Sequence, residues 1–171
     1  EGFILVYLPF EDQDAVTALL SRLPAHRFIQ YARDLPPTIK GNVTRRTANT
    51  QSFKQHLAAC SGVICNSGFE LISECLHWGK RVLTRPLQGQ MEQLSNALAL
   101  EQLGYASTLQ SLSPEAIAHW LDHTTTAPAL SMIDGSFQLG TAIGQPEITI
   151  LGVSSATTQT PSATRCSSSS Q

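Results

Sequence analysis

The sequence is 171 residues long, with 42% hydrophobic residues, 14% charged residues and a formal net charge of −2. This length suits one domain with a sizeable core but is short for a complete two-domain enzyme. The small negative charge argues against a nucleic-acid partner, and no run approaches the roughly 18 apolar residues that a membrane helix needs.

The first 123 residues alternate short apolar runs with segments of helical period, which is typical of an α/β domain with a parallel sheet. Residues 3–8 (FILVYL) form a continuous apolar run, as expected of a strand buried on both faces. Further strands are predicted at residues 26–32, 42–46, 62–65, 81–86 and 105–108. Helices are predicted at residues 12–23, 52–60, 69–78 and 90–103, and from Ser113-Pro114 onward. The two prolines in residues 35–40 (LPPTIK) predict a loop there.

The alternating pattern ends after His123. The next stretch has no period, and residues 147–153 (EITILGV) fit only an isolated edge strand. From Ser154 onward the chain is too rich in Ser, Thr and Gln to bury itself. We therefore expect one domain over residues 1–123 and an irregular, disordered tail over residues 124–171.

The four cysteines are Cys60, Cys65, Cys75 and Cys166, and they show neither CxxC spacing nor a histidine at zinc-finger spacing. Three of them lie in apolar stretches, which favours buried, reduced thiols in a cytoplasmic protein. The apolar run FILVYL follows an acidic residue and no basic region, unlike a signal peptide.

Residues 12–14 (DQD) resemble an acidic triplet that binds a metal. They also lie where a helix favours acids in its first turn, and no other ligand completes a metal site. We therefore expect no metal. The basic pairs 45–46 (RR) and 80–81 (KR) are most simply solvated, although Arg45 or Arg46 follows a strand and is placed to line a nucleotide cleft.

The turn Asn66-Ser67-Gly68 joins a predicted buried strand to a helix, where doubly wound sheets bind ligands. Gly68 allows a close backbone approach, and the free N–H groups of the helix start suit a diphosphate. Ser67 either adds a hydroxyl donor or caps the helix. Glu74 lies one turn beyond Glu70, where its carboxylate can accept both ribose hydroxyls. The alternative is that Glu70 balances the helix dipole and Glu74 is a solvated surface residue.

A second turn, at Gly89, leads into the predicted helix over residues 90–103. Glu92 and Gln93 fall in its first turn, and such an acid–amide pair is suited to bind neighbouring sugar hydroxyls. The alternative is a helix-start acid beside an unrelated polar residue. The residues of this helix that we expect to face the core are Leu94, Ala97, Leu98 and Leu103.

Residues 63–106 together resemble the C-terminal domain of GT-B glycosyltransferases. They are most similar to the bacterial transferases that add N-acetylglucosamine to the lipid-linked peptidoglycan precursor and to related family-1-type and family-28-type enzymes. The resemblance combines the small-residue turn, a Glu on the next helix, a strand ending in Pro and the motif EQxxNAxxLxxLG. Weaker similarity extends back to residues 3–9 (FILVYLP). One departure is Arg81 after Lys80, where the family commonly has Pro.

The resemblance implies a role for each of these positions. The turn at residues 66–68 meets the diphosphate of a nucleotide sugar, with UDP favoured, and Glu74 meets the ribose. Glu92 and Gln93 meet the transferred sugar. Arg46 and Thr47, after the third strand, flank the base.

The resemblance also implies a Rossmann-like doubly wound parallel sheet that forms the C-terminal half of a GT-B fold. The activity would be of the hexosyltransferase type, with no cofactor. An N-terminal domain of the same enzyme would bind the acceptor, a sugar, a lipid-linked molecule or a small molecule, and would supply the catalytic base. We therefore expect this chain alone to bind the donor weakly and to transfer nothing. Half of a nucleotide-sugar 2-epimerase and a non-catalytic nucleotide-sugar-binding module remain alternatives.

Overall fold

The computed structural model describes residues 2–66, 68–123, 131–133, 136–138 and 149–150. The strands are β1 (Ile4–Tyr7), β2 (Phe28–Ala32), β3 (Thr38–Lys40), β4 (Val43–Thr47), β5 (Gly62–Asn66), β6 (Arg81–Arg85), β7 (Ser107–Thr108), β8 (Ser131–Ile133), β9 (Ser136–Gln138) and β10 (Thr149–Ile150). The helices are α1 (Gln13–Ser21), α2 (Thr50–Ala59), α3 (Phe69–His77), α4 (Met91–Gln102) and α5 (Pro114–His123).

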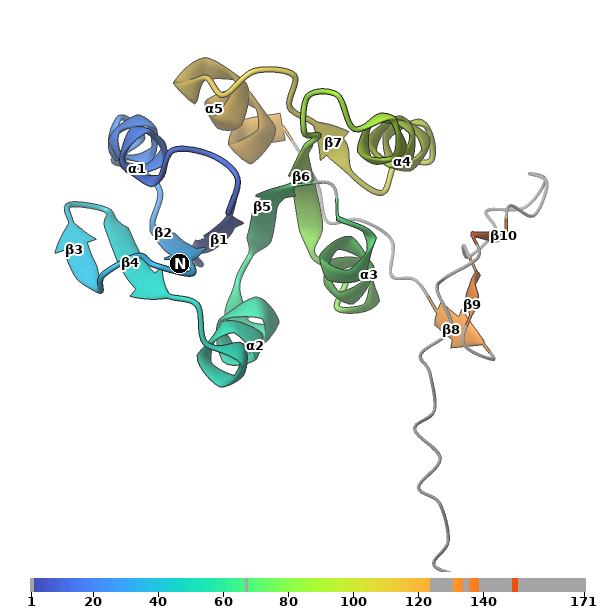
Figure 1. The fold of residues 1–171 in the computed structure, drawn as a ribbon, viewed down its shortest axis with the longest axis horizontal. Coiled ribbons are helices and arrows are strands. Elements are labelled where there is room, and N and C mark those ends of the chain that lie inside the picture. The colour runs from blue at the N-terminus through green and yellow to red at the C-terminus, as the bar shows by residue number, and fades with distance from the viewer. Residues whose placement is uncertain (1, 67, 124–130, 134–135, 139–148, 151–171) are drawn as a thin grey trace, which may run out of the picture.

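The main sheet of the described chain has seven strands in the order β3-β4-β2-β1-β5-β6-β7 (Figure 1). All neighbouring pairs are parallel except β3 with β4. Along the chain, the parallel strands β4-β2-β1-β5-β6-β7 are the third, second, first, fourth, fifth and sixth, which is the doubly wound Rossmann order. The predicted fold class is therefore confirmed. The order reverses between β1 and β5, and this switch point is where such sheets bind ligands.

Helices cover both faces of this sheet (Figure 1). On one face α1 and α5 pack on the strands through a buried cluster that includes Val16 and Trp120. On the other face α2, α3 and α4 pack through a cluster that includes Leu57, Ile72 and Leu100. The β1 side chains alternate between the two clusters, which explains why its sequence is an unbroken apolar run.

The predicted helix boundaries hold to within a few residues because capping signals flank them. Asp12, at the start of the acidic triplet, accepts a hydrogen bond from the Ala15 N–H at 2.7 Å and so caps α1. Gly79 and Gly104 follow α3 and α4 with φ angles of 62° and 74°, a left-handed conformation that glycine adopts without strain.

The loop predicted over residues 35–40 is only partly a loop, because Thr38–Lys40 forms β3. Pro36 and Pro37 lie just before this strand, so the positions without an N–H do not interrupt its pairing. Gly41, with φ 57°, then turns the chain back so that Lys40 pairs with Val43 of β4.

Three basic residues that were predicted to be solvated are held by the fold. Arg45 is only 7% exposed and pairs with Asp14 at 2.9 Å. The Lys80 Nζ donates to the carbonyls of Ala58 and Cys60. Arg81 donates to the Leu121 carbonyl, and its guanidinium lies 4.8 Å from the centre of the Trp120 ring. These partners are distant in sequence, so local pattern gave no sign of them.

The core face of α4 also differs from the prediction. Ala97 and Leu100 are buried and Leu103 packs against the core, but Leu94 and Leu98 are exposed. Apolar residues surround this helix on more than one side, so its periodicity does not single out one face.

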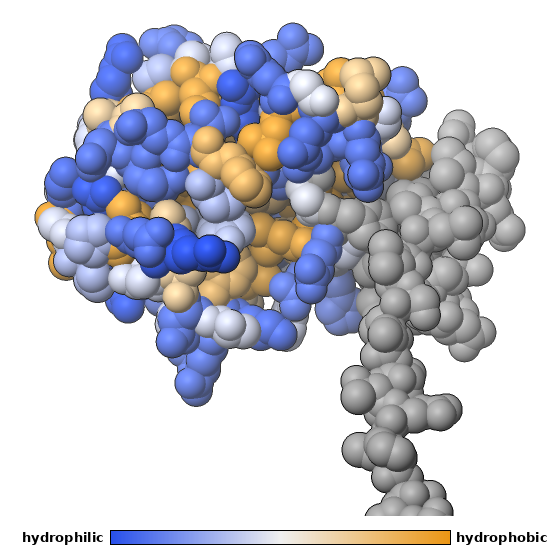
Figure 2. Space-filling view, in the orientation of Figure 1, coloured by the Kyte–Doolittle hydropathy of each residue, from blue (hydrophilic) through white to orange (hydrophobic). Residues whose placement is uncertain are grey.

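Outside the main sheet, β8, β9 and β10 form a small antiparallel sheet. β10 lies within the segment 147–153 that fits an edge strand, and most of the predicted tail lies outside the described residues. In the part of the chain that is described, no helix is long and apolar enough to cross a membrane. Figure 2 shows the face of Figure 1, where hydrophilic residues dominate and apolar surface is visible between them.

Candidate functional site

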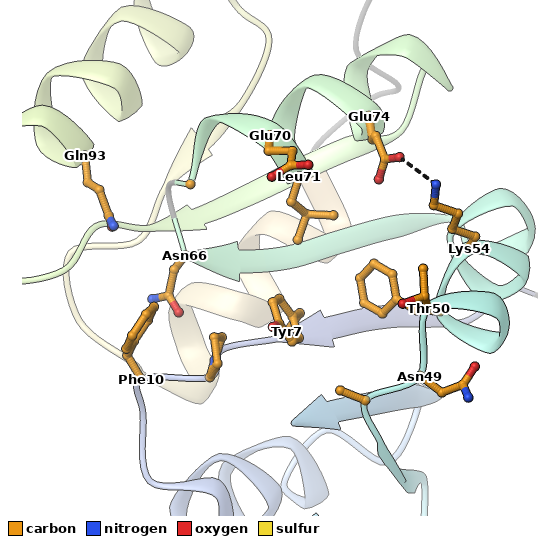
Figure 3. A pocket seen from close by; sticks show the side chains of 14 residues that line it. Tyr7, Phe10, Asn49, Thr50, Lys54, Asn66, Glu70, Leu71, Glu74 and Gln93 are labelled. Carbon is orange, nitrogen blue, oxygen red and sulfur yellow. Dashed lines mark ion pairs between the residues drawn. The ribbon is translucent and has the colours of Figure 1, made fainter. Parts of the chain in front are cut away.

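A pocket of about 710 Å³ opens at the switch point of the sheet (Figure 3). Its lining comes from the end of β1 and the loop after it, the loop between β4 and α2, the end of β5, and the starts of α2, α3 and α4. Of the residues predicted to bind a ligand, it brings together Asn66, Gly68, Glu74 and Gln93. Asn66, Gly68 and Glu74 lie on the continuous β5–α3 segment, and the start of α4, which follows the neighbouring strand β6, brings Gln93 beside them.

Asn66 was predicted to lie in the turn after the strand, whereas in the structure it is the last residue of β5. It is 7% exposed, and its Nδ2 donates to the Arg85 carbonyl at the end of β6, at 3.0 Å. Its Oδ1 is buried and has no hydrogen-bond partner among the described residues. The side chain therefore ties two strand ends together and leaves an acceptor unused.

The start of α3 lies beside Asn66 and has no side-chain cap. Its N-cap is Gly68, whose own N–H donates back to the Asn66 carbonyl at 2.8 Å. The N–H groups of the following first turn carry the positive end of the helix dipole at the pocket. Ser67, predicted to add a hydroxyl donor or a cap, lies outside the described residues.

Glu74 lies one turn further along α3, and its carboxylate is half-exposed at the pocket wall. Its Oε1 is 3.7 Å from the Lys54 Nζ of α2, so the ion pair spans the pocket wall from one helix to the next (Figure 3). Both groups are substantially solvated, and an ion pair of this kind contributes little to stability. The Glu74 carboxylate is therefore available to a ligand at small cost.

The wall opposite α3 belongs to α2 and β1. Asn49 caps α2, because its side chain accepts from the Gln51 and Ser52 N–H groups at 3.0 and 3.1 Å. Beyond it, the rings of Phe53 and Tyr7 meet edge to face with centroids 5.4 Å apart. This wall is largely apolar and its shape is fixed by aromatic packing.

Arg46 and Thr47, predicted to flank the base, end β4 and are exposed. Neither lines the pocket, to which this part of the chain contributes Ala48, Asn49 and Thr50. The Thr47 hydroxyl instead donates to the Leu35 carbonyl at 2.8 Å. The pocket lining thus includes the residue directly after Thr47, and the role of Arg46 and Thr47 beside the base stays a prediction.

Of the predicted sugar-binding pair in the first turn of α4, only Gln93 lines the pocket. The Gln93 side chain lines the pocket, accepting from the Leu87 N–H at 3.1 Å and donating to the Gln90 side chain at 2.7 Å. Glu92 is exposed in the first turn of α4 and does not line the pocket. Adjacent helical residues point about 100° apart, so one pocket rarely receives both side chains.

Sequence reasoning missed the loop between β1 and α1. Phe10 lines the pocket there with 69% of its surface exposed. Glu11 pairs with Arg85 at 3.3 Å, and the Gln13 side chain donates to the Leu8 and Glu11 carbonyls. Hydrogen bonds and an ion pair therefore hold this loop in place. The signal available in the sequence was an aromatic residue, Phe10, in the loop that follows the first strand.

A smaller pocket of about 450 Å³ lies at the carboxyl ends of β6 and β7. Met91, Leu94 and Leu98 of α4 line one side of it, and all three are exposed. Its apolar lining and the absence of charged residues other than Arg85 distinguish it, within the described residues, from the pocket at the switch point.

The described cysteines are free and buried, as predicted for Cys60, Cys65 and Cys75, whereas Cys166 lies outside the described residues. Burial raises the pKa of Cys65 to about 12 and also raises the pKa of Cys60 and of Cys75. Such thiols are poor nucleophiles and poor metal ligands at neutral pH. Among the described residues, no group of three His, Cys, Asp or Glu side chains is placed to hold a metal.

Known structures share this fold. The chain matches the glycotransferase of kitacinnamycin with a TM-score of 0.58 and 19% identity, over 73% of this chain and 35% of that one. It matches the glycosyltransferase SsfS6 of Streptomyces sp. SF2575 with a TM-score of 0.54 and 20% identity, over 71% of this chain and 32% of that one. The solution structure of ALG13 matches with a TM-score of 0.54 and 13% identity, over 74% of this chain and 89% of that one.

The chain thus spans about a third of the length of the first two proteins, with coverage of 35% and 32%. No curated protein matches the sequence. The family model for glycosyl transferase family 1 matches residues 1–124, which is the whole of the α/β domain. The resemblance in the sequence is thereby confirmed, and the chain belongs to glycosyl transferase family 1, as a Rossmann-like half of a GT-B fold.

Proposed function

We propose that this domain binds the nucleotide-diphosphate sugar donor of a glycosyltransferase, with UDP as the nucleotide. The observation that carries the proposal is the uncapped start of α3, which opens into the pocket at the switch point of the sheet. A helix start supplies N–H donors and positive potential to an anion. The diphosphate would bind at Gly68 and the N–H groups of the first turn.

The nucleoside would extend from there toward α2. Glu74 would accept hydrogen bonds from the two ribose hydroxyls, replacing its weak ion pair with Lys54. The base would lie against Ala48, Asn49 and Thr50, which line that end of the pocket. This places the base slightly beyond Arg46 and Thr47, the residues that the sequence indicates.

The sugar would extend the other way, toward α4. Gln93 lines that end of the pocket, and its side chain is held by the Leu87 N–H and the Gln90 amide. It would therefore meet the sugar with a fixed orientation. Glu92 would reach the sugar only from the rim, because it lies outside the lining in this structure.

In transfer, the bond between the anomeric carbon and the diphosphate oxygen breaks while an acceptor hydroxyl bonds to that carbon. The acceptor proton passes to a base, which we assign to an N-terminal domain of the same enzyme. The α3 dipole and first-turn N–H groups would stabilise the negative charge that develops on the leaving diphosphate. The hexosyltransferase type of the reaction and the inability of this chain alone to perform it are part of the proposal.

Two acids on one helix face test the assignment. Glu74→Ala should weaken UDP binding roughly 10- to 100-fold, because it removes charge-assisted hydrogen bonds to the ribose. Glu70→Ala is the matched control: Glu70 lies in the first turn beside the proposed diphosphate, so its removal should leave UDP binding unchanged or stronger. Isothermal titration calorimetry with UDP, GDP and dTDP measures both variants.

Intact UDP binding in Glu74→Ala would refute the ribose assignment. Failure of the unmodified chain to bind any of the three nucleotides would refute the proposed function itself. A product assay on a protein that also carries the acceptor domain distinguishes glycosyl transfer from 2-epimerisation.

A further inference from the structure

The end of the pocket that faces the β1–α1 loop has a chemistry of its own. Phe10, Asn66 and Gln93 lie at this end, whereas Glu74 and Lys54 lie at the other (Figure 3). Phe10 offers an exposed ring, and Asn66 and Gln93 offer neutral amides. The nearby cation, Arg85, is engaged by the Glu11 carboxylate and by the Gln110 carbonyl.

The Phe10 ring is exposed although hydrogen bonds and an ion pair hold its loop. Single exposed apolar side chains are common on protein surfaces, and Phe10 is distinguished by lining the pocket. The loop is fixed by the Glu11–Arg85 pair and by the two hydrogen bonds from the Gln13 side chain. The ring is thus presented at the pocket by a preorganised segment, which lowers the entropy cost of using it in binding.

Asn66 adds a buried acceptor at the same end of the pocket. Its Nδ2 donates to the Arg85 carbonyl, and exchanging the two amide atoms would set Oδ1 against that carbonyl, so the orientation is fixed. Its Oδ1 has no partner among the described residues. An acceptor that lacks a partner when buried is unfavourable, so a ligand that supplies a donor is preferred there. A diphosphate oxygen is an acceptor and does not satisfy it, whereas a sugar hydroxyl does.

We propose that Phe10 and Asn66 form the hexose subsite of the pocket, on the premise that the proposed function is correct. The Phe10 ring stacks on an apolar C–H face of the sugar, and the Asn66 Oδ1 accepts a hydrogen bond from one sugar hydroxyl. Asn66 is thereby assigned to the sugar and not to the diphosphate. A pyranose ring matches this end because it is uncharged and combines an apolar face with a rim of donors.

Calorimetry on the 171-residue chain with UDP and UDP-glucose tests the stacking. Phe10→Ala should weaken UDP-glucose binding on the order of tenfold and leave UDP binding unchanged, since only the sugar contacts the ring. Phe10→Tyr should retain the affinity for UDP-glucose. Ile39→Ala is the matched control, because Ile39 is equally exposed on β3, away from the pocket.

An equal loss for UDP and UDP-glucose in Phe10→Ala would overturn the subsite. So would unchanged affinity for both, which would instead make Phe10 a contact for another part of the enzyme. If the unmodified chain binds no nucleotide, the proposed function fails, and saturation-transfer NMR with methyl glucoside then decides on the subsite alone. Transfer to sugar C–H protons that falls in Phe10→Ala supports it, and an absent or unchanged signal overturns it.

The hydrogen bond from the sugar to Asn66 is tested by a cycle of ligand and protein changes. One UDP-hexose analogue that lacks a single hydroxyl should bind the unmodified chain roughly 3- to 10-fold more weakly than the parent. In Asn66→Ala, the same analogue and its parent should bind equally well. Circular dichroism verifies the fold, with Asn66→Ser as a second variant. Equal losses in all three proteins would exclude the hydrogen bond.

Discussion

The helices of this domain fall into two groups that differ at their first turns. α1, α2 and α5 are capped by side chains of the chain itself, with donor–acceptor distances of 2.7 Å at Asp12, 3.0 Å at Asn49 and 3.1 Å at Ser113. α3 and α4 begin at Gly68 and Gln90 without a side-chain cap. The uncapped helices follow β5 and β6, which lie on one side of the switch point, and both line the pocket together with the capped helix α2.

A side-chain cap typically stabilises a helix by about 1 kcal/mol. Three helices of the domain use one, so its omission from α3 is a local departure from the way this chain builds helices. The departure coincides with the pocket, and a bound anion would supply the acceptors that a cap provides elsewhere. Under the proposed function, α3 lacks the stabilisation of a side-chain cap so that its first-turn N–H groups remain free to bind the donor.

The largest expected effect comes from giving α3 the cap that it lacks. Gly68 has φ −71° and ψ 127°, which any residue adopts, and an added Cβ meets no atom within 4 Å. Gly68→Asp should therefore fold, and should gain roughly 0.5–1 kcal/mol of unfolding free energy from the new cap and the helix dipole. Its carboxylate would repel the diphosphate, so the Kd for UDP should rise roughly 100-fold. Thermal denaturation and calorimetry measure the two effects.

The other uncapped helix provides the matched control for this variant. Gln90→Asp adds the same charge at the start of α4, outside the residues that line the main pocket. It should stabilise the protein by a similar amount and leave UDP binding unchanged. A Gly68→Asp protein that binds UDP normally would show that the start of α3 is not the anion site. An equal loss in both variants would indicate a general charge effect.

Much of the fold was predictable from the sequence, but elements that depend on distant partners were not. Helices and buried strands were predictable because their apolar periods and capping residues are local signals, as at Asp12 and Ser113. β3 was missed because two prolines outweighed the short pairing segment behind them. Lys80 and Arg81 were misjudged because their partners come from distant elements.

Pocket residues were predictable from the sequence where a motif follows a strand or opens a helix, as at Asn66, Gly68 and Gln93. Phe10 and Asn49 lie on loops after the first and third parallel strands, and only the strand order brings these loops to the pocket. Glu92 lies outside the pocket lining, and its part in sugar binding stays a prediction. A motif residue beside Gln93 is carried by the turn of the helix out of the pocket that its neighbour enters.

A smaller effect is expected from removing a cap that the chain does supply. Asp12→Ala deletes the acceptor of the Ala15 N–H and should cost about 1 kcal/mol of unfolding free energy. Asp12 does not line the pocket, so UDP affinity should stay within twofold of the unmodified value. Urea denaturation and calorimetry check the two halves of this statement. A loss of binding without a loss of stability would reverse the roles assigned to the capped and uncapped helices.

The smallest effect is expected from acid, which weakens a capped helix at its other end. His56, in the last turn of α2, lies 2.7 Å from the Tyr31 hydroxyl. Burial, and secondarily the positive charge of Arg46, lowers the pKa of His56 below its usual value.

The unfolded chain therefore binds a proton more readily than the folded chain at this residue. The stability contributed by His56 is complete above about pH 6.5 and falls as the pH drops below it. We therefore expect a lower Tm at pH 5 than at pH 7.5, by a small amount because the imidazole is only partly buried. His56→Gln, which keeps a polar partner for Tyr31 but does not titrate, should flatten this part of the profile. A profile with the same slope in both proteins would assign the acid sensitivity to other groups.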